Sequence, residues 1–123
     1  MEDGGYFFNF DNGFRLLWLD SAGPLTEGYH RLAEQFPTID VGLIPLYGLD
    51  ESIPPTMEYV RLFKPAIMMP TLHDGAPGSG FDMPTVPLFL KIREELPKTK
   101  TFAPLYRTPV CVNTRTKQIF VGQ

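Results

Sequence analysis

The stretch that decides the fold is residues 5–20, GYFFNFDNGFRLLWLD. Two aromatic-rich runs flank the tripeptide Asp-Asn-Gly at 11–13, and an Asn-Gly pair readily adopts the positive φ angles of a tight hairpin turn. The sequence therefore predicts antiparallel strands at about 5–10 and 14–19. Large apolar side chains alternate along both runs, which predicts packing into the core; they are Tyr6, Phe8, Phe10, Phe14, Leu16 and Trp18.

Two helix–strand pairs follow the hairpin. Apolar residues of segment 25–36 recur at the spacing of one helix face, which predicts a first helix. Segment 52–65 predicts a second helix, which ends at Pro65. Continuous apolar runs at 41–47 and 66–70 predict short strands buried on both faces, with an edge or a bulge near Pro45. The order of these strands and helices along the chain predicts an α/β fold. We expect a mixed sheet with an N-terminal hairpin, a parallel βαβαβ core and helices on one face.

Polar side chains follow the predicted strands at their carboxyl ends. Asp20 ends FRLLWLD and His73 ends AIMMPTLH. Because the ends of parallel strands meet at one edge of a sheet, we expect this carboxylate and imidazole to converge, and both are suitable metal ligands. Tyr47, Asp50 and Asp74 follow strands at the same edge and are candidate substrate contacts.

Each of these residues also has a purely structural interpretation. Asp20 could be a turn or helix-cap residue ahead of Ser-Ala-Gly-Pro at 21–24, and His73 an ordinary loop histidine. His30 lies beside the apolar stripe of the first helix and is predicted to be structural. Asp40 precedes a strand and is predicted to cap or pair locally.

The second half of the chain is less regular. The glycine- and proline-rich stretch 74–84 is either a lid over the predicted site or a plain surface connection. Thr85 is predicted to cap a third helix over 86–96. Strands are predicted near 109–113 and 118–121, joined by a turn.

Length and composition limit the alternatives. A chain of 123 residues predicts a single domain over 1–123. The net charge of -3 argues against a nucleic-acid partner, and no apolar run approaches the roughly 20 residues of a membrane span. The acidic N-terminus lacks the basic region of a signal peptide. Cys111 is the single cysteine of the sequence, so an internal disulfide is excluded and we expect a cytoplasmic protein. Its side chain is predicted to be small and buried.

The sequence resembles a known family in three ordered segments: LDSAGP at 19–24, FPTIDVGLIPLYG at 36–48 and AIMMPTLHDG at 66–75. A predicted helix that ends in Lys-Pro separates the last two. Together they resemble the C-terminal half of metallo-β-lactamase-fold hydrolases, most closely the ascorbate-lactonase-like branch. The resemblance covers residues 5–75 and implies that the chain forms one half of an αββα sandwich.

The resemblance also implies roles for individual residues. Asp20 would bridge two metal ions, and His73 would ligate the second. The implied cofactor is zinc, and the implied substrate is a small molecule with an ester, lactone, amide or phosphodiester group. A metal-activated water would attack that group.

One large departure from the family pattern qualifies this implication. The family carries its main metal motif, His-x-His-x-Asp-His, in the N-terminal half, whereas this chain contains only His30 and His73. A catalytic zinc takes about three protein ligands and an open water position, and the resemblance supplies two. The chain is a fragment or truncated product, or it joins a polypeptide that carries the N-terminal half, or it has lost the activity. In each case we expect it to be inactive alone.

A non-catalytic binding or assembly module is the alternative from another class. Half of a sandwich leaves one face of its sheet uncovered, and an exposed apolar face is a typical association site. This alternative predicts a homo-oligomer formed through that face, whether or not metal is present.

Overall fold

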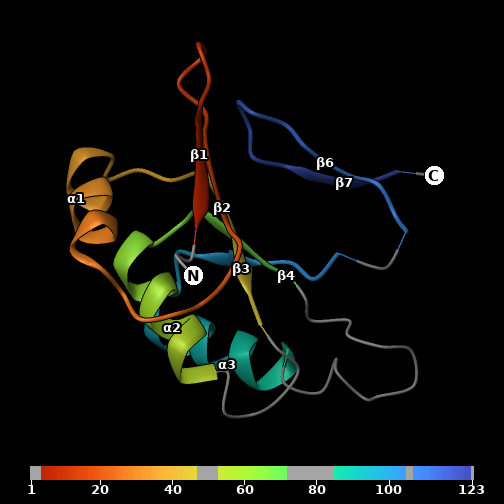
Figure 1. Cartoon of the computed structure of the whole chain (residues 1–123). Coiled ribbons are helices and arrows are strands. Elements are labelled where there is room, and N and C mark those ends of the chain that lie inside the picture. Colours follow the sequence, from red (N-terminus) through yellow and green to blue (C-terminus); the bar gives the residue numbers. More distant parts are fainter. Residues whose placement is uncertain (1–3, 47–52, 72–84, 105–106, 123) are drawn as a thin grey trace.

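The computed structural model describes residues 4–46, 53–71, 85–104 and 107–122. Within these ranges the chain forms a mixed α/β structure (Figure 1), whose elements in chain order are β1 (Gly5–Asn9), β2 (Arg15–Leu19), α1 (Glu27–Gln35), β3 (Val41–Pro45), α2 (Ile53–Phe63), β4 (Ile67–Thr71), α3 (Thr85–Glu95), β5 (Lys100–Thr101), β6 (Val110–Val112) and β7 (Ile119–Val121).

Five strands form one mixed sheet in the order β1-β2-β3-β4-β5, and β6 and β7 form a separate hairpin. β1 and β2 are antiparallel, whereas β2, β3, β4 and β5 are parallel. Gly13 takes a φ of 84° in the turn between β1 and β2, where the Phe10 N–H donates to the Phe14 carbonyl at 2.9 Å. The predicted α/β class, the N-terminal hairpin and the parallel core are confirmed.

Differences from the prediction lie mainly at element ends. α1 begins at Glu27, so Leu25 precedes it. Thr85 is the first residue of α3, and its buried Oγ1 has no hydrogen-bond partner, so the predicted side-chain cap does not form. The two-residue strand β5 has no sequence signal of its own, because only its pairing with Ile67 and Met68 of β4 defines it.

Pro45 lies in an interior strand, so the predicted edge or bulge is wrong. It ends β3, opposite Thr71 of β4. The next residue, Leu46, donates its N–H to the Thr71 carbonyl at 2.8 Å, so strand alternation turns the Pro45 nitrogen towards β2. The pairing with β2 already ends at Trp18 and Leu43. The missing N–H therefore costs no ladder hydrogen bond.

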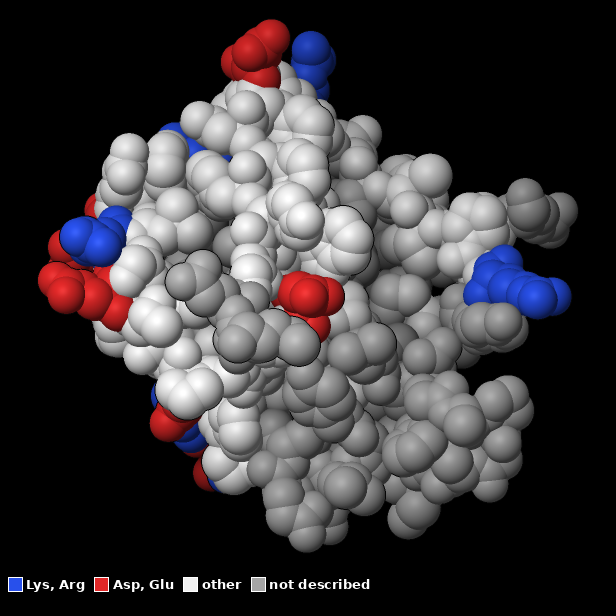
Figure 2. Space-filling model, in the orientation of Figure 1, with Lys and Arg blue, Asp and Glu red and all other residues white. Residues whose placement is uncertain are grey.

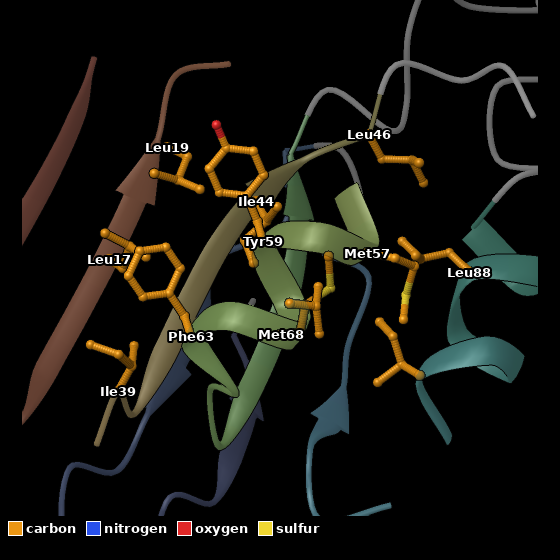
Figure 3. Packing of buried hydrophobic residues seen from close by; sticks show 12 residues of the cluster. Leu17, Leu19, Ile39, Ile44, Leu46, Met57, Tyr59, Phe63, Met68 and Leu88 are labelled. Carbon is orange, nitrogen blue, oxygen red and sulfur yellow. The ribbon is translucent and has the colours of Figure 1, made fainter. Parts of the chain in front are cut away.

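The first face of the sheet is covered by the three helices. Side chains from the sheet interdigitate with those of α2 and α3 (Figure 3), and α1 packs against the same cluster. The fully buried members include Leu17, Ile44, Tyr59 and Met68. This layer of helix on sheet holds the larger of two buried clusters, so it supplies most of the hydrophobic stabilisation.

The second face is covered only in part. The β6–β7 hairpin lies on this side of the sheet (Figure 1), where Val110, Val112 and Ile119 pack against a smaller cluster that includes Ile67 and Met69. This hairpin pairs with no strand of the five-stranded sheet. Among the described residues, side-chain contacts therefore hold this hairpin against the sheet.

Two burial predictions are wrong, and both concern the second face. The aromatic side chains of the β1–β2 hairpin share that face, and the Tyr6 and Trp18 rings lie 5.6 Å apart. The sequence predicts that these side chains pack into the core, but four of them are exposed, namely Tyr6, Phe8, Phe10 and Trp18. Cys111 is also exposed. Its neighbours Val110 and Val112 face the sheet, and alternation along the strand turns the Cys111 side chain away.

Within the described part of the chain, no helix has the length and apolar character needed to cross a membrane.

Candidate functional site

Asp20 lies at the carboxyl edge of the parallel strands. It follows Leu19, the last residue of β2, and it is exposed. Its backbone N–H donates to the Gly4 carbonyl at 3.1 Å, which extends the β1–β2 ladder by one pair and fixes where the chain leaves the sheet. Pro45 and Thr71 end β3 and β4 on the same edge, because these strands run parallel to β2. Open α/β sheets bind their ligands at this edge.

The order of the strands sets the distance that a shared site must span. β3 separates β2 from β4, and neighbouring strands lie about 4.8 Å apart, so the ends of β2 and β4 are roughly 10 Å apart. A ligand shared between Asp20 and a residue beyond β4 would therefore lie over the end of β3. Side chains from both outer strands would have to lean inward to reach it.

The remaining predicted site residues lie outside the described ranges. They are His73, Tyr47, Asp50 and Asp74, together with the stretch 74–84. The structure thus places Asp20 and follows β4 to Thr71, two residues before His73. His30 is described, and it is exposed on α1.

The described residues do not complete a metal site. Among them, no three His, Cys, Asp or Glu side chains lie close enough together to hold a metal ion. The carboxyl edge offers the Asp20 carboxylate, whereas a catalytic zinc takes three or so protein ligands. The described residues alone therefore support no reaction step through a metal.

Asp40 is a buried carboxylate at the opposite, amino edge of the sheet. It is 4% exposed, and its Oδ2 accepts a 2.7 Å hydrogen bond from the Arg15 N–H. Its Oδ1 forms an ion pair with Lys117 Nζ at 2.5 Å, and its carbonyl accepts from the Ile67 N–H. The predicted local pairing is wrong, because these partners belong to β2, β4 and the β6–β7 turn. Asp40 joins the terminal hairpin to the sheet.

The amino edge also carries a hollow of about 680 Å³ that the sequence reasoning missed. Its lining comes from the segments before β3, β4 and β5, namely Pro37–Ile39, Lys64–Ala66 and Glu95–Thr99. The sequence feature that could have indicated this hollow is the proline that follows each helix, at 37, 65 and 97. Five residues of β3 separate this hollow from the carboxyl edge, a distance of roughly 16 Å, so it is not part of the Asp20 site.

An ion pair links α2 to α3 on the outside of the helix layer. Arg61 Nε and Nη2 donate to the Glu95 carboxylate at 2.7 Å and 2.9 Å. The hydrogen bond from Arg61 lowers the pKa of Glu95, and the same bond raises the pKa of Arg61. Both groups are exposed to solvent, so the pair fastens two helices weakly and makes no catalytic site.

No protein-family model matches the sequence, and no curated protein matches it. Function has to be inferred from the residues and their geometry.

Proposed function

We propose that this chain is the C-terminal half of a metal-dependent hydrolase with the metallo-β-lactamase fold, and that it is incomplete as a catalyst. The observation that supports this is the exposed Asp20 at the carboxyl end of β2, on the edge that β4 reaches two residues before His73. The α/β layering, with helices on one face of the sheet, is compatible with half of an αββα sandwich.

In the proposed centre, Asp20 would hold zinc through its carboxylate and His73 through its imidazole. The remaining ligands come from a histidine-rich N-terminal half, in the same polypeptide or in another. Zinc held there would supply a water molecule of lowered pKa and a positive charge next to the substrate oxygen. Tyr47, Asp50 and Asp74 are proposed substrate contacts, and the substrate is a small ester, lactone, amide or phosphodiester.

A location in the cytoplasm belongs to the same proposal. Cys111 has no second cysteine with which to form an internal disulfide. The fold therefore does not depend on an oxidising compartment.

Zinc titration by calorimetry tests the hydrolase proposal. The chain alone should bind zinc weakly or not at all. After addition of an N-terminal half that carries the His-x-His-x-Asp-His motif, we expect tight binding of two metal ions and hydrolysis of esters or lactones. Asp20→Ala should abolish both gains. Asp11→Ala is the matched control, because Asp11 is an exposed aspartate at the far end of the same hairpin. Mixing that changes neither zinc affinity nor hydrolysis would contradict the proposal.

A second candidate function is a non-catalytic assembly module, which the four exposed aromatic residues of the second face favour. This candidate predicts an oligomer that is indifferent to chelators and survives Asp20→Ala and His73→Ala. Analytical ultracentrifugation with and without chelator separates the two candidates. An oligomer that dissociates when zinc is removed would contradict the assembly candidate.

A further inference from the structure

Among the described strands, β1 is the outermost of the sheet, and it presents backbone groups that no described residue pairs with. The Phe10 N–H donates to the Phe14 carbonyl, and the Gly4 carbonyl accepts from the Asp20 N–H. The backbone N–H and C=O groups of the even-numbered residues in this segment therefore point towards β2. Strand alternation directs the N–H and C=O groups of the odd residues outward. These residues are Gly5, Phe7 and Asn9, and their outward groups make no hydrogen bond within the described chain.

This edge lacks the features by which sheet proteins prevent pairing with another chain. Protected edges carry charged side chains, proline or a bulge. β1 is GYFFN, without charge or proline, and it pairs with β2 in register over all five residues. Figure 2 shows uncharged surface where β1 runs, with charged side chains at its margins. As far as the described residues go, the edge is therefore open to a further strand.

We propose that β1 pairs antiparallel with β1 of a second copy of this chain, about a twofold axis at Phe7. In this register Gly5 of one copy lies opposite Asn9 of the other, and Phe7 lies opposite Phe7. All outward groups of the strand then find partners at once, because an antiparallel strand matches itself about its middle residue. The result is one continuous sheet of two copies. This pairing gives the assembly candidate a partner and a contact, and it is independent of Asp20 and of metal.

The side chains of the second face support a second copy as the occupant. In the proposed register Tyr6 lies opposite Phe8 of the second copy at a close, non-hydrogen-bonded position, so the aromatic surfaces of both copies join. The net charge of -3 per chain is small, so two copies repel each other little.

The exposed area sets the expected strength. Tyr6, Phe8, Phe10 and Trp18 are 41–59% exposed. Aromatic side chains of ~150–250 Å² then leave roughly 300–500 Å² per copy, against about 800 Å² per partner in a stable complex. We therefore expect a weak dimer whose population depends on concentration.

Two double variants test the register. Tyr6→Lys with Phe8→Lys places like charges opposite each other twice across the axis, whereas Tyr6→Glu with Phe8→Lys places opposite charges there. Both remove the same aromatic area from exposed positions. By sedimentation equilibrium the parent should dimerise, and both variants should dissociate more readily because they lose two of the four exposed aromatic residues. The Lys/Lys variant should dissociate about tenfold more readily than the Glu/Lys variant.

Asn9→Pro and Asn9→Ala form a second matched pair. Proline removes one outward N–H at an exposed position and alanine keeps it, so only Asn9→Pro should weaken the dimer. A parent that stays monomeric at every concentration would overturn the proposal. Equal dissociation of the Lys/Lys and Glu/Lys variants would also overturn it, and would leave association through the aromatic face standing without the β1 pairing.

Discussion

The two faces of the five-stranded sheet are covered in different ways. Three helices cover the first face and bury Leu17, Ile44 and Met68 completely. A short hairpin covers part of the second face and leaves Tyr6 and Trp18 about half exposed. The first face therefore holds the chain together, whereas the second face has apolar surface to spare for another molecule. The difference teaches that the main buried core and the exposed aromatic residues of the described chain lie on opposite sides of one sheet.

Truncation of a side chain on each face gives the sharpest test of this difference. Ile44→Ala should lower the free energy of unfolding by about 2–5 kcal/mol, because Ile44 is fully buried under the helices and leaves a cavity. Phe8→Ala, on the second face, should cost about 1 kcal/mol or less. Urea denaturation measures both. Equal losses would mean that something covers the second face in solution as fully as the helices cover the first.

Removal of Asp40 should have the next largest effect and should act on the second face. Asp40→Ala leaves the Arg15 N–H without its partner and frees Lys117, so we expect a loss of about 1–3 kcal/mol. Hydrogen exchange should become faster at Asn113 and Gly122, whose N–H groups donate to carbonyls across the terminal hairpin. Lys117→Ala is the comparison variant, and it should cost less because Lys117 is partly solvated. Unchanged exchange in the hairpin would show that Asp40 does not fasten it.

Tyr59→Phe tests whether a side chain under the first face holds the segment that follows Asp20. The Tyr59 hydroxyl donates to the Gly23 carbonyl at 2.7 Å, and loss of this bond should cost about 1 kcal/mol. Thermal unfolding measures the change, and Tyr6→Phe should leave stability unaltered because Tyr6 is exposed. If the two variants unfold alike, the hydroxyl does not hold this segment.

The sequence predicts those parts of the fold that local signals determine. The Asp-Asn-Gly turn and the alternation around it predict the hairpin, and the apolar runs at 41–47 and 66–70 predict strands that the structure confirms as β3 and β4. β5 is different, because two residues carry no periodicity and only the neighbouring strand makes them a strand.

Burial and the candidate site are harder to predict, because both depend on which elements meet. The alternation of Tyr6, Phe8 and Phe10 correctly predicts a shared face, but it cannot tell a covered face from an exposed one. The ion pair of Asp40 with Lys117 joins distant segments that no sequence spacing connects. Asp20 follows the simpler rule that a residue after a parallel strand lies at the carboxyl edge, so its position was predictable from the strand order alone.

The Arg61–Glu95 pair should have the smallest effect, because it lies on the solvent side of the helix layer. The pKa of Glu95 is lowered in the folded state by the hydrogen bond from Arg61, so the pair stabilises the fold above the ordinary glutamate pKa. That contribution is lost as the pH falls through the lowered pKa. Glu95→Gln should therefore lower the Tm slightly near neutral pH, and the difference from the parent should vanish in acid. Glu94→Gln, an exposed neighbour, should show no such difference at either pH. A Glu95→Gln deficit that persists in acid would assign its effect to packing of α2 on α3 and not to charge.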